Sequence, residues 1–532
     1  MIMHENSVRT LRSIAFVAAA ALLVVACQSD APDDEGGAAA DEETTVVVAI
    51  SDDLSTVDPQ GGTGIIDRNV LQNVTDGIIR RNGETGELIP HIATEWELSD
   101  DELVWSITLR DDVTFHNGDH FTAEDLKASI DRMNHPNLGG TLGENFFVVE
   151  ETRIIDDYHV ELHLSEPAPL LMLFAERLLL APKSWIEDIG YEVYSSREPA
   201  PGLGAYRLVE WDRGNEIVFE AFDDYFLGRP QIDRVIFRVI PDEAARVAAL
   251  RAGEVDVVDQ LSPVQVDQVE GDEALKVVPS LSMARVRVSI DQRKPPFDIL
   301  ELRQAINYAI DVDTIIDELL PGAVRTPAGL VPQELGFNPD LEPYEYDPDR
   351  ARELLAEAGF PDGIGPVEFS VYPSYSQSEE AAQAIQSYLA EVGIQTEIRV
   401  YEAADFVTRK QEKHDNPAGL GPLMLDGHSG GNTFHGYHFY QNVVNCVQGS
   451  VTHAGYGCHD DIDALHDEAV ATWAKNPERT IEVLQEAEVL LQQHAWAGFL
   501  YQVPALYAMA ADLDWQPSPA EQSQLRFASW AN

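Results

Sequence analysis

The chain has 532 residues, 44% of them hydrophobic, which is typical of a globular protein with two or three domains. Acidic residues outnumber basic residues by 92 to 35, for a formal net charge of −57. A surface this acidic repels nucleic acids, so no nucleic-acid partner is expected. Because such self-repulsion needs screening by salt, we interpret the charge as a halophilic-type surface; an unusually acidic mesophilic surface is the alternative.

The N-terminus has the features of a lipoprotein leader. Arg9 and Arg12 precede the apolar run SIAFVAAAALLVVA, which has signal-peptide length and is short for a membrane span. The run ends in LVVAC, which resembles a lipobox in which Cys27 is acylated and the chain is cut before it. An ordinary secretory signal with an incidental cysteine is the alternative. We predict a lipoprotein signal peptide over residues 1–27 and a flexible acidic tether over 28–44, with the mature chain anchored by lipid outside the cytoplasmic membrane.

The first half of the mature chain alternates between predicted strands and helices. TVVVAI at Thr45–Ile50 predicts a buried strand, and ELVWSITLRDDVTFHNG alternates with period two, which predicts a hairpin. TAEDLKASIDRM predicts a helix capped by Thr122. GNEIVFEAF and IDRVIFRVI predict strands, and DEAARVAALRAGEVDVV predicts a helix that ends at Gly253, followed by a strand.

The second half continues this alternation. Four segments have apolar residues at helical spacing: ILELRQAINYAIDVDTIIDELL, DPDRARELLAEAGF, SEEAAQAIQSYLAEVGI and NPERTIEVLQEAEVLLQQHA. Between them, VEFSVYP, QTEIRVY and PLMLD predict strands, and the tail FLYQVPALYAMAADL returns to strand-like alternation. The interleaving predicts α/β layers.

Five blocks in order resemble a known family. They are HIATEWELSDDELVWSITLRDDVTFHNGDHFTAEDL, GLGAYRLVEWDRGNEIVFEAFDDYFLGRPQIDRVIFRVIPDEAARVAALRAGEVDVV, LRQAINYAIDVDTII, YDPDRARELLAEAGFPDG and AWAGFLYQVPALYA. They are similar to the family 5 extracellular solute-binding proteins, the peptide, nickel and opine class of ABC-importer receptors. The resemblance covers about residues 45–519. It implies an α/β, two-lobed fold like that of periplasmic binding proteins (type II, cluster C), with a hinge and a ligand cleft between the lobes.

The resemblance also implies a domain plan and partners. We expect lobe I at 45–280 with an extra subdomain at about 90–200, lobe II at 281–503, and a C-terminal segment, 504–532, returning to lobe I. The implied function is that of a monomeric, non-enzymatic receptor without a cofactor. It would pass a small solute, most simply an oligopeptide, to membrane permease subunits and their ATPases. The chain has no P-loop of its own.

The segment GHSGG, at 427–431, matches the G-x-S-x-G pattern of serine hydrolases. Such an elbow needs a strand before the serine and a helix after it. PLMLD supplies a strand, but NTFHGYHFYQNVVNC has no clear helical stripe. A secreted esterase with Ser429 as nucleophile is therefore the disfavoured alternative.

Candidate ligand-binding residues follow from the resemblance. Asp426 matches the place of a carboxylate that anchors a ligand ammonium group; a solvated or loop-capping role is the alternative. The other candidates are His428, Asn432, Phe434, Tyr375, Asp58 and Asp67. The turn Ser378-Glu379-Glu380 lacks the basic residue that pairs with the carboxylate of a dipeptide in some relatives. This argues against a strict dipeptide ligand and is compatible with longer peptides or with cationic or neutral solutes.

Histidines and cysteines suggest further sites. Seven of the fifteen histidines lie between His414 and His466, and His428, His435 and His438 are candidate metal ligands. A nickel or metal-chelate receptor is the rival function, although polar loop residues explain the histidines more simply. Cys446 and Cys458 are expected to form a disulfide, with metal ligation the weaker interpretation. The sequence leaves the solute open among peptides, metal chelates, opines and sugars.

Overall fold

The computed structural model describes most of the chain beyond the predicted tether. The described residues are 43–61, 65–82, 87–138, 146–192, 198, 200–372, 377–410, 419–428, 435–444, 457–473, 475–517 and 524–531. They belong to one compact unit, Glu43–Asn532. Within these ranges, no helix has the length and apolar character needed to cross a membrane.

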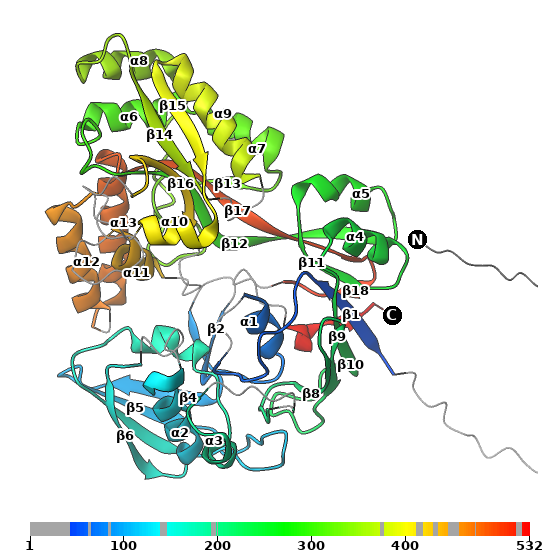
Figure 1. Cartoon of the computed structure of the whole chain (residues 1–532). Helices are drawn as coiled ribbons and strands as arrows, with labels where there is room; N and C mark the ends of the chain where they lie inside the picture. The colour runs from blue at the N-terminus through cyan, green and yellow to red at the C-terminus, as the bar shows by residue number, and fades with distance from the viewer. Residues whose placement is uncertain are drawn as a thin grey trace, which may run out of the picture. The chain divides into compact units, whose positions relative to one another are not determined.

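The largest element of the fold is an eleven-stranded mixed sheet (Figure 1). Its strand order is β15-β14-β16-β12-β17-β11-β1-β10-β9-β8, and β13 pairs with β17 outside this order. The strands are β1 (Thr45–Ile50), β8 (Tyr206–Asp212), β9 (Glu216–Ala221), β10 (Arg234–Val239), β11 (Val257–Leu261), β12 (Leu275–Ile290), β13 (Val324–Arg325), β14 (Ile364–Val371), β15 (Ile394–Val400), β16 (Leu423–His428) and β17 (Ala497–Ala510).

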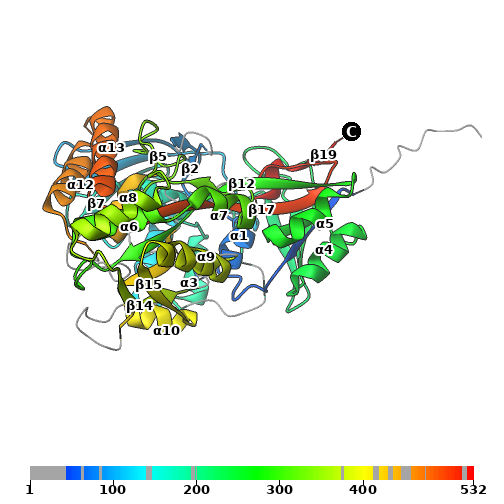
Figure 2. The ribbon, with the colours of Figure 1, turned by 90° about the horizontal axis from the view of Figure 1, so that it is seen from above.

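Two long antiparallel strands, β12 and β17, join the two ends of this sheet (Figures 1 and 2). In the first part of the ladder, residues 275–281 of β12 pair with residues 504–510 of β17, and β11 pairs with the other edge of β17. In the second part, residues 285–289 of β12 pair with residues 497–502 of β17, and β16 pairs with the other edge of β12. The register shifts between Leu281 and Arg285. The domain limits expected at 280/281 and 503/504 therefore lie within continuous strands, next to this shift.

The first lobe is built on the β11-β1-β10-β9-β8 end of the sheet. β1 runs parallel to both β10 and β11, and its apolar residues Val46, Val48 and Ile50 are buried. The strand predicted at Thr45–Ile50 is confirmed. Asp242 caps α4 by accepting a hydrogen bond from Ala245 N, and Gly253 follows the helix with φ +69°. The helices of this region are α1 (Ile65–Leu71), α4 (Glu243–Arg251), α5 (Val266–Glu270) and the 3₁₀ turn η3 (Pro263–Gln265).

A separate four-stranded antiparallel sheet, β4-β5-β7-β6, belongs to the same region of the chain as the expected subdomain. Its strands are β4 (Ala93–Leu98), β5 (Val104–Leu109), β6 (Val149–Asp156) and β7 (His159–Leu164). Around it lie α2 (Ala123–Met133), α3 (Lys183–Ile189), η1 (Pro136–Leu138), η2 (Leu171–Arg177) and the two-stranded sheet of β2 (Ile79–Arg81) and β3 (Leu88–Pro90). Thr122 and Asp125 form a capping box at α2.

One sequence prediction in this subdomain is wrong. The hairpin expected within ELVWSITLRDDVTFHNG does not form, because β5 pairs with β4 and β7 instead. The segment after β5 makes a turn, in which Gly118 N donates to Phe115 O, and contributes only an isolated bridge between Thr114 and His120. The alternation there comes from burial of Val113 and Phe115 in a loop.

The second lobe is built on the β15-β14-β16 end, where β14 is parallel to both neighbours. Its helices are α6 (Leu300–Ala309), α7 (Val312–Leu319), α8 (Pro348–Glu357), α9 (Ser378–Glu391), α10 (Ala403–Lys410), α11 (Gly436–Phe439), η5 (Tyr440–Val444), α12 (Asp460–Thr472) and α13 (Pro477–Gln493). The single helix expected over ILELRQAINYAIDVDTIIDELL is two helices. Asp311 divides them, because its side chain caps α7 by accepting from Thr314 N.

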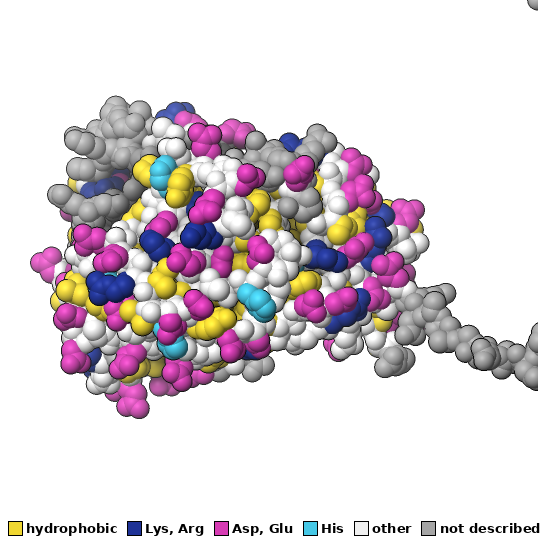
Figure 3. All heavy atoms as spheres, turned by 90° about the horizontal axis from the view of Figure 1, so that it is seen from below, with side chains coloured by type: hydrophobic (Ala, Val, Ile, Leu, Met, Phe, Trp, Pro, Cys, Tyr) yellow, Lys and Arg dark blue, Asp and Glu magenta, His cyan; other side chains and the backbone are white. Residues whose placement is uncertain are grey.

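Acidic side chains are spread over the molecular surface. Figure 3 shows one face, on which Asp and Glu are scattered and Lys and Arg are fewer. The charge on this face is not concentrated in one patch. It therefore fits a solvating role better than a binding surface.

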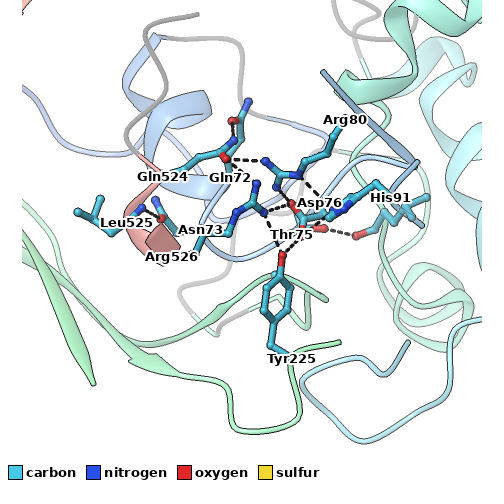
Figure 4. A network of polar contacts seen from close by, with 12 residues as sticks. Gln72, Asn73, Thr75, Asp76, Arg80, His91, Tyr225, Gln524, Leu525 and Arg526 are labelled. Atoms are coloured by element: carbon cyan, nitrogen blue, oxygen red, sulfur yellow. Dashed lines mark hydrogen bonds and ion pairs between the residues drawn. The ribbon is translucent and has the colours of Figure 1, made fainter. Parts of the chain in front are cut away.

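A buried polar network holds the C-terminal segment on the first lobe (Figure 4). That segment contains β18 (Leu513–Asp514), η6 (Leu525–Phe527) and β19 (Ser529–Trp530). Asp76 is 2% exposed and pairs with Arg80, with His91 at 3.2 Å and with Arg526 at 3.1 Å. The Tyr225 hydroxyl also donates to Asp76, at 2.9 Å. Segments far apart in sequence thus share one carboxylate.

The charges around Asp76 keep it ionised. Burial alone would raise the pKa, but the charges of Arg80 and His91 and hydrogen bonds from His91 and Tyr225 lower the pKa to about 2. The carboxylate therefore stabilises the fold above its ordinary pKa, and that contribution is lost as pH falls towards 2.

We expect Asp76→Asn to lower the free energy of unfolding by about 3–5 kcal/mol, because it leaves buried arginines without their counter-charge. Urea denaturation at neutral pH measures the change. The matched control is Asp112→Asn, which breaks an exposed pair with Arg110 and should stay within about 1 kcal/mol of wild type. Equal effects of the two variants would contradict a central role for the network.

Candidate ligand-binding site

The candidate ligand anchor Asp426 lies on β16, which pairs with β12. Along β12, Val286, Val288 and Ile290 are buried in the apolar core of the second lobe, whereas Arg285, Arg287 and Ser289 point to the opposite face. The register pairs Arg287 with Asp426 on β16. The alternation of a strand thus places three polar residues beside the predicted ligand anchor.

Asp426 is buried and bound within the protein. It is 3% exposed, accepts a hydrogen bond from Ser289 Oγ at 2.7 Å, and lies 3.5 Å from Arg287 Nη2. A buried carboxylate is retained only where cations and donors compensate its lost hydration. Asp426 is therefore part of a compact unit of one carboxylate, one guanidinium and one hydroxyl.

Arg285 is fixed by a second buried acid. It forms a two-pronged ion pair with Glu334, with Nη2 to Oε1 at 2.9 Å, and Nη1 donates to Gly329 O at 2.9 Å. Its guanidinium also lies over the ring of Phe439, 4.8 Å from the centroid. Gly329 has to lack a side chain, because a Cβ atom there would lie 2.1 Å from the Phe439 ring.

Helix α11 contributes aromatic and imidazole side chains. His435 caps the helix, since its Nδ1 accepts from Tyr437 N at 3.0 Å, and its ring packs edge-on against Trp473 at 4.5 Å. Tyr437 stacks on His466 at 5.2 Å, and His438 lies 6.4 Å from Phe174 of η2. Of these three rings, that of His438 therefore reaches a residue of the first lobe.

A cavity of about 300 Å³ lies between this helix and the first lobe. Its lobe I side is formed by η2 and the preceding loop, including Leu171 and Phe174. Its lobe II side is formed by Tyr437, Gln441 and Val470. This volume is at the lower end of the range of small-molecule sites, and its position between lobes is where such sites commonly lie.

Burial keeps the two histidines of α11 neutral. For His435, burial first and then the charge of Arg81 lower the pKa to about 3. For His438, burial first and then Arg177 and Arg285 lower the pKa to about 3. Both imidazoles are therefore uncharged at physiological pH.

The structure brings together only part of the predicted site. Tyr375, Ser429, Asn432 and Phe434 lie outside the described residues, as do Cys27 and Cys446. His428 ends β16 opposite Arg285, and its side chain is outside the described set.

Asp58 and Asp67 have partners within the first lobe. Asp58 forms a two-pronged pair with Arg132, at 2.9 and 2.5 Å, and accepts from Gln60 N. Asp67 accepts from the backbone and hydroxyl of Ser55 at 2.8 and 2.6 Å. Both carboxylates hold the loop after β1, and ligand contacts there stay predictions.

Cys458 takes part in a disulfide, and the partner lies outside the described residues. The candidate metal ligands His435 and His438 do not belong to a group of three potential metal ligands in the described part of the chain. That part contains one such group, His459, Asp461 and His494.

Sequence reasoning missed Arg285, Arg287 and Glu334. The segment MARVRVSID carries a usable signal, because two arginines alternate with valines in a predicted strand. The acidic partners of these two arginines could not be predicted from a local sequence pattern. Glu334 lies in a loop, and the pairing of Arg287 with Asp426 depends on strand register.

Two lobes joined by a pair of strands, with a cavity between them, are typical of solute-binding proteins. The comparisons with known proteins agree with this class. The model for "Bacterial extracellular solute-binding proteins, family 5 Middle" matches residues 87–450. The chain belongs to this family. It is therefore an extracytoplasmic receptor that serves an ABC importer, not an enzyme, and the esterase interpretation of Ser429 is not supported.

Individual relatives are distant. The chain is 26% identical over 376 residues to the glutathione-binding protein GsiB of Pectobacterium atrosepticum, covering 70% of this chain and 72% of that one. It is 27% identical over 445 residues to the dipeptide-binding protein of Escherichia coli, covering 77% and 80%. Its fold is similar to that of the periplasmic binding protein DppA from Helicobacter pylori in complex with peptide STSA, with a TM-score of 0.72, 23% identity and coverage of 92% and 98%. The predicted fold class is confirmed.

The neutral His435 predicts an acid-sensitive contribution to stability. As pH falls from about 6.5 towards 3, the unfolded state takes up a proton that the folded state does not, so the free energy of unfolding decreases. Between pH 7 and pH 5 this loss should be about 2 kcal/mol for one such histidine. His435→Asn keeps a capping acceptor but does not titrate. Between pH 7 and pH 5 its free energy of unfolding should therefore fall by about 2 kcal/mol less than that of wild type, as measured by denaturation at both pH values. The exposed control His159→Asn should follow wild type; an unchanged slope in His435→Asn would contradict the assignment.

Proposed function

We propose that this receptor captures a peptide or peptide-like solute between its lobes, with Asp426 holding the solute's ammonium group. The observation that carries the proposal is the buried unit of Asp426, Arg287 and Ser289 on the neighbouring strands β12 and β16. Family membership supports the receptor function, and the glutathione and dipeptide relatives support peptides as the solute class.

The chemistry of this unit favours a zwitterionic head group. Asp426 and Arg287 present opposite charges 3.5 Å apart. An α-amino acid terminus carries an ammonium and a carboxylate on one carbon, so it is complementary to such a pair. The γ-glutamyl end of glutathione has this arrangement, whereas an ordinary dipeptide separates its two charges.

The start of α9 agrees with this preference. Glu379 and Glu380 occupy its first turn and are exposed, and Gln377 is the preceding residue. This turn offers no cation for a peptide carboxylate. The proposal therefore places glutathione-like γ-peptides and longer peptides ahead of strict dipeptides.

A thermal-shift screen in high salt tests the solute class. The panel contains glutathione, dipeptides, peptide pools of up to about eight residues, sugars, and Ni²⁺ with and without histidine. A ligand at about one hundred times its Kd adds roughly 2.7 kcal/mol of stability. Shifts with peptides support the proposal. A shift restricted to Ni²⁺ complexes would favour the metal-chelate receptor instead.

Asp426→Asn should weaken binding of the best peptide roughly 10- to 100-fold, because a charge-assisted hydrogen bond contributes about 1.5–3 kcal/mol. Titration calorimetry measures the affinity. Asp349→Asn on α8, at a side chain that is 92% exposed, is the matched control and should bind like wild type. Since Asp426 also compensates Arg287, circular dichroism establishes that the variant is folded. A folded Asp426→Asn protein with unchanged affinity would contradict the anchor role.

We also propose that the receptor is a monomer held at the membrane by a lipid on Cys27. The leader sequence supports the anchor, and a tether keeps a receptor concentrated near its permease. Cys27→Ser should move the protein from the detergent phase to the aqueous phase in Triton X-114 partitioning and abolish acylation detected by mass spectrometry. Unchanged partitioning would favour an ordinary secretory signal.

A further inference from the structure

Three potential metal ligands meet where α12 begins and α13 ends. His459 is the residue before α12, Asp461 is in its first turn, and His494 follows the last residue of α13. Each offers one ligand atom, and these atoms lie within 4.8 Å of one another. The two imidazole rings are stacked with centroids 4.0 Å apart. The start of α12 and the end of α13 thus bring two imidazole nitrogens and one carboxylate oxygen close together.

Gln292 holds the ring of His459 in place. Its Nε2 donates to Trp496 O at 3.3 Å, so its Oε1 faces His459 Nε2, at 3.1 Å. A carbonyl oxygen at that position requires His459 to carry its proton on Nε2, and the lone pair is then on Nδ1. Metal-binding histidines commonly donate their other N–H to such an oxygen, which fixes the tautomer and the ring.

The other two residues are positioned by neighbouring elements. His494 Nε2 lies 2.9 Å from Asp461 Oδ2, and the backbone carbonyl of His494 accepts from Arg303 Nη2 at 2.8 Å. Gly457 lies two residues before His459, and its carbonyl oxygen accepts a hydrogen bond from Trp496 Nε1 at 3.0 Å. The backbone on both sides of the cluster is therefore held in place.

The ligand chemistry selects a class of metal. Two imidazoles and one carboxylate suit Zn²⁺, Ni²⁺ or Cu²⁺, whereas Ca²⁺ and Mg²⁺ prefer oxygen ligands alone. His494 and Asp461 have side-chain exposures of 29% and 50%, so an ion and a completing water can reach them.

We propose that His459, Asp461 and His494 bind a divalent transition-metal ion of the zinc type. The ion links the start of α12 to the end of α13. The site is separate from the solute cavity, because Val470, which lines the cavity, lies at the other end of α12, about 15 Å away along the helix at roughly 1.5 Å per residue. The ion stabilises the second lobe and takes no part in solute capture.

Equilibrium dialysis and thermal melting of EDTA-treated protein with Zn²⁺ alone test the proposal. We expect one Zn²⁺ per chain and a higher Tm in wild type, and neither in His459→Asn/His494→Asn. Asparagine is suitable because it is a favoured residue at the helix start. The matched control His435→Asn/His438→Asn should retain both effects. No uptake by wild type, or equal uptake by the His459→Asn/His494→Asn variant, would overturn the proposal.

Two further measurements separate ligation from a general effect on folding. Gln292→Leu should weaken Zn²⁺ binding roughly 10- to 100-fold, as loss of a ligand-orienting contact does. Co²⁺ in place of Zn²⁺ should give visible absorption bands of four-coordinate geometry in wild type and in the His435→Asn/His438→Asn control, and none in the His459→Asn/His494→Asn variant. Bands that depend on His435 and His438 would place the metal in the cleft and overturn the assignment.

Discussion

The antiparallel pairing of β12 with β17 is the constraint on which the two-lobed structure depends. Each strand belongs to both lobes, so the chain crosses between them in hydrogen-bonded strands rather than in loops. The register shift between Leu281 and Arg285 divides this ladder into two parts. Such irregularities bend a strand and increase its local twist, so the two ends of the eleven-stranded sheet can differ in orientation. Arg285 and Arg287, which begin the second part, lie directly beyond this point.

Buried arginine–carboxylate pairs form a second common feature. Arg132 with Asp58, Arg285 with Glu334 and Arg526 with Asp76 are all nearly inaccessible to solvent. In a chain with 92 acidic and 35 basic residues, these inward cations compensate buried acids while the surface retains a large negative excess. Salt screens exposed charges much more than buried ones. High ionic strength therefore relieves the surface repulsion without loosening the pairs that hold the lobes.

The sequence predicts the elements better than their contacts. Local patterns identify β1 and α13 because the apolar spacing that predicts them is contained within the segments. The false hairpin after β5 arose because a buried loop can alternate like a strand. Asp426 was proposed through the family resemblance, but its partner Arg287 lies 139 positions earlier in the chain and meets it only through strand register. Long-range pairing of this kind leaves no local pattern.

The same reasoning applies to the histidines at 435, 438, 459 and 494, whose spacing in the sequence differs from their grouping in the fold. In the sequence, His435 and His438 are close together, yet the fold uses His435 as a helix cap and packs both rings among aromatic and apolar groups. His459 and His494 are 35 positions apart, and the turn between α12 and α13 brings them into contact. Metal ligation requires converging lone pairs and a fixed tautomer, and here the backbone topology and Gln292 supply both. Proximity in space, not density in sequence, identifies the candidate ligands.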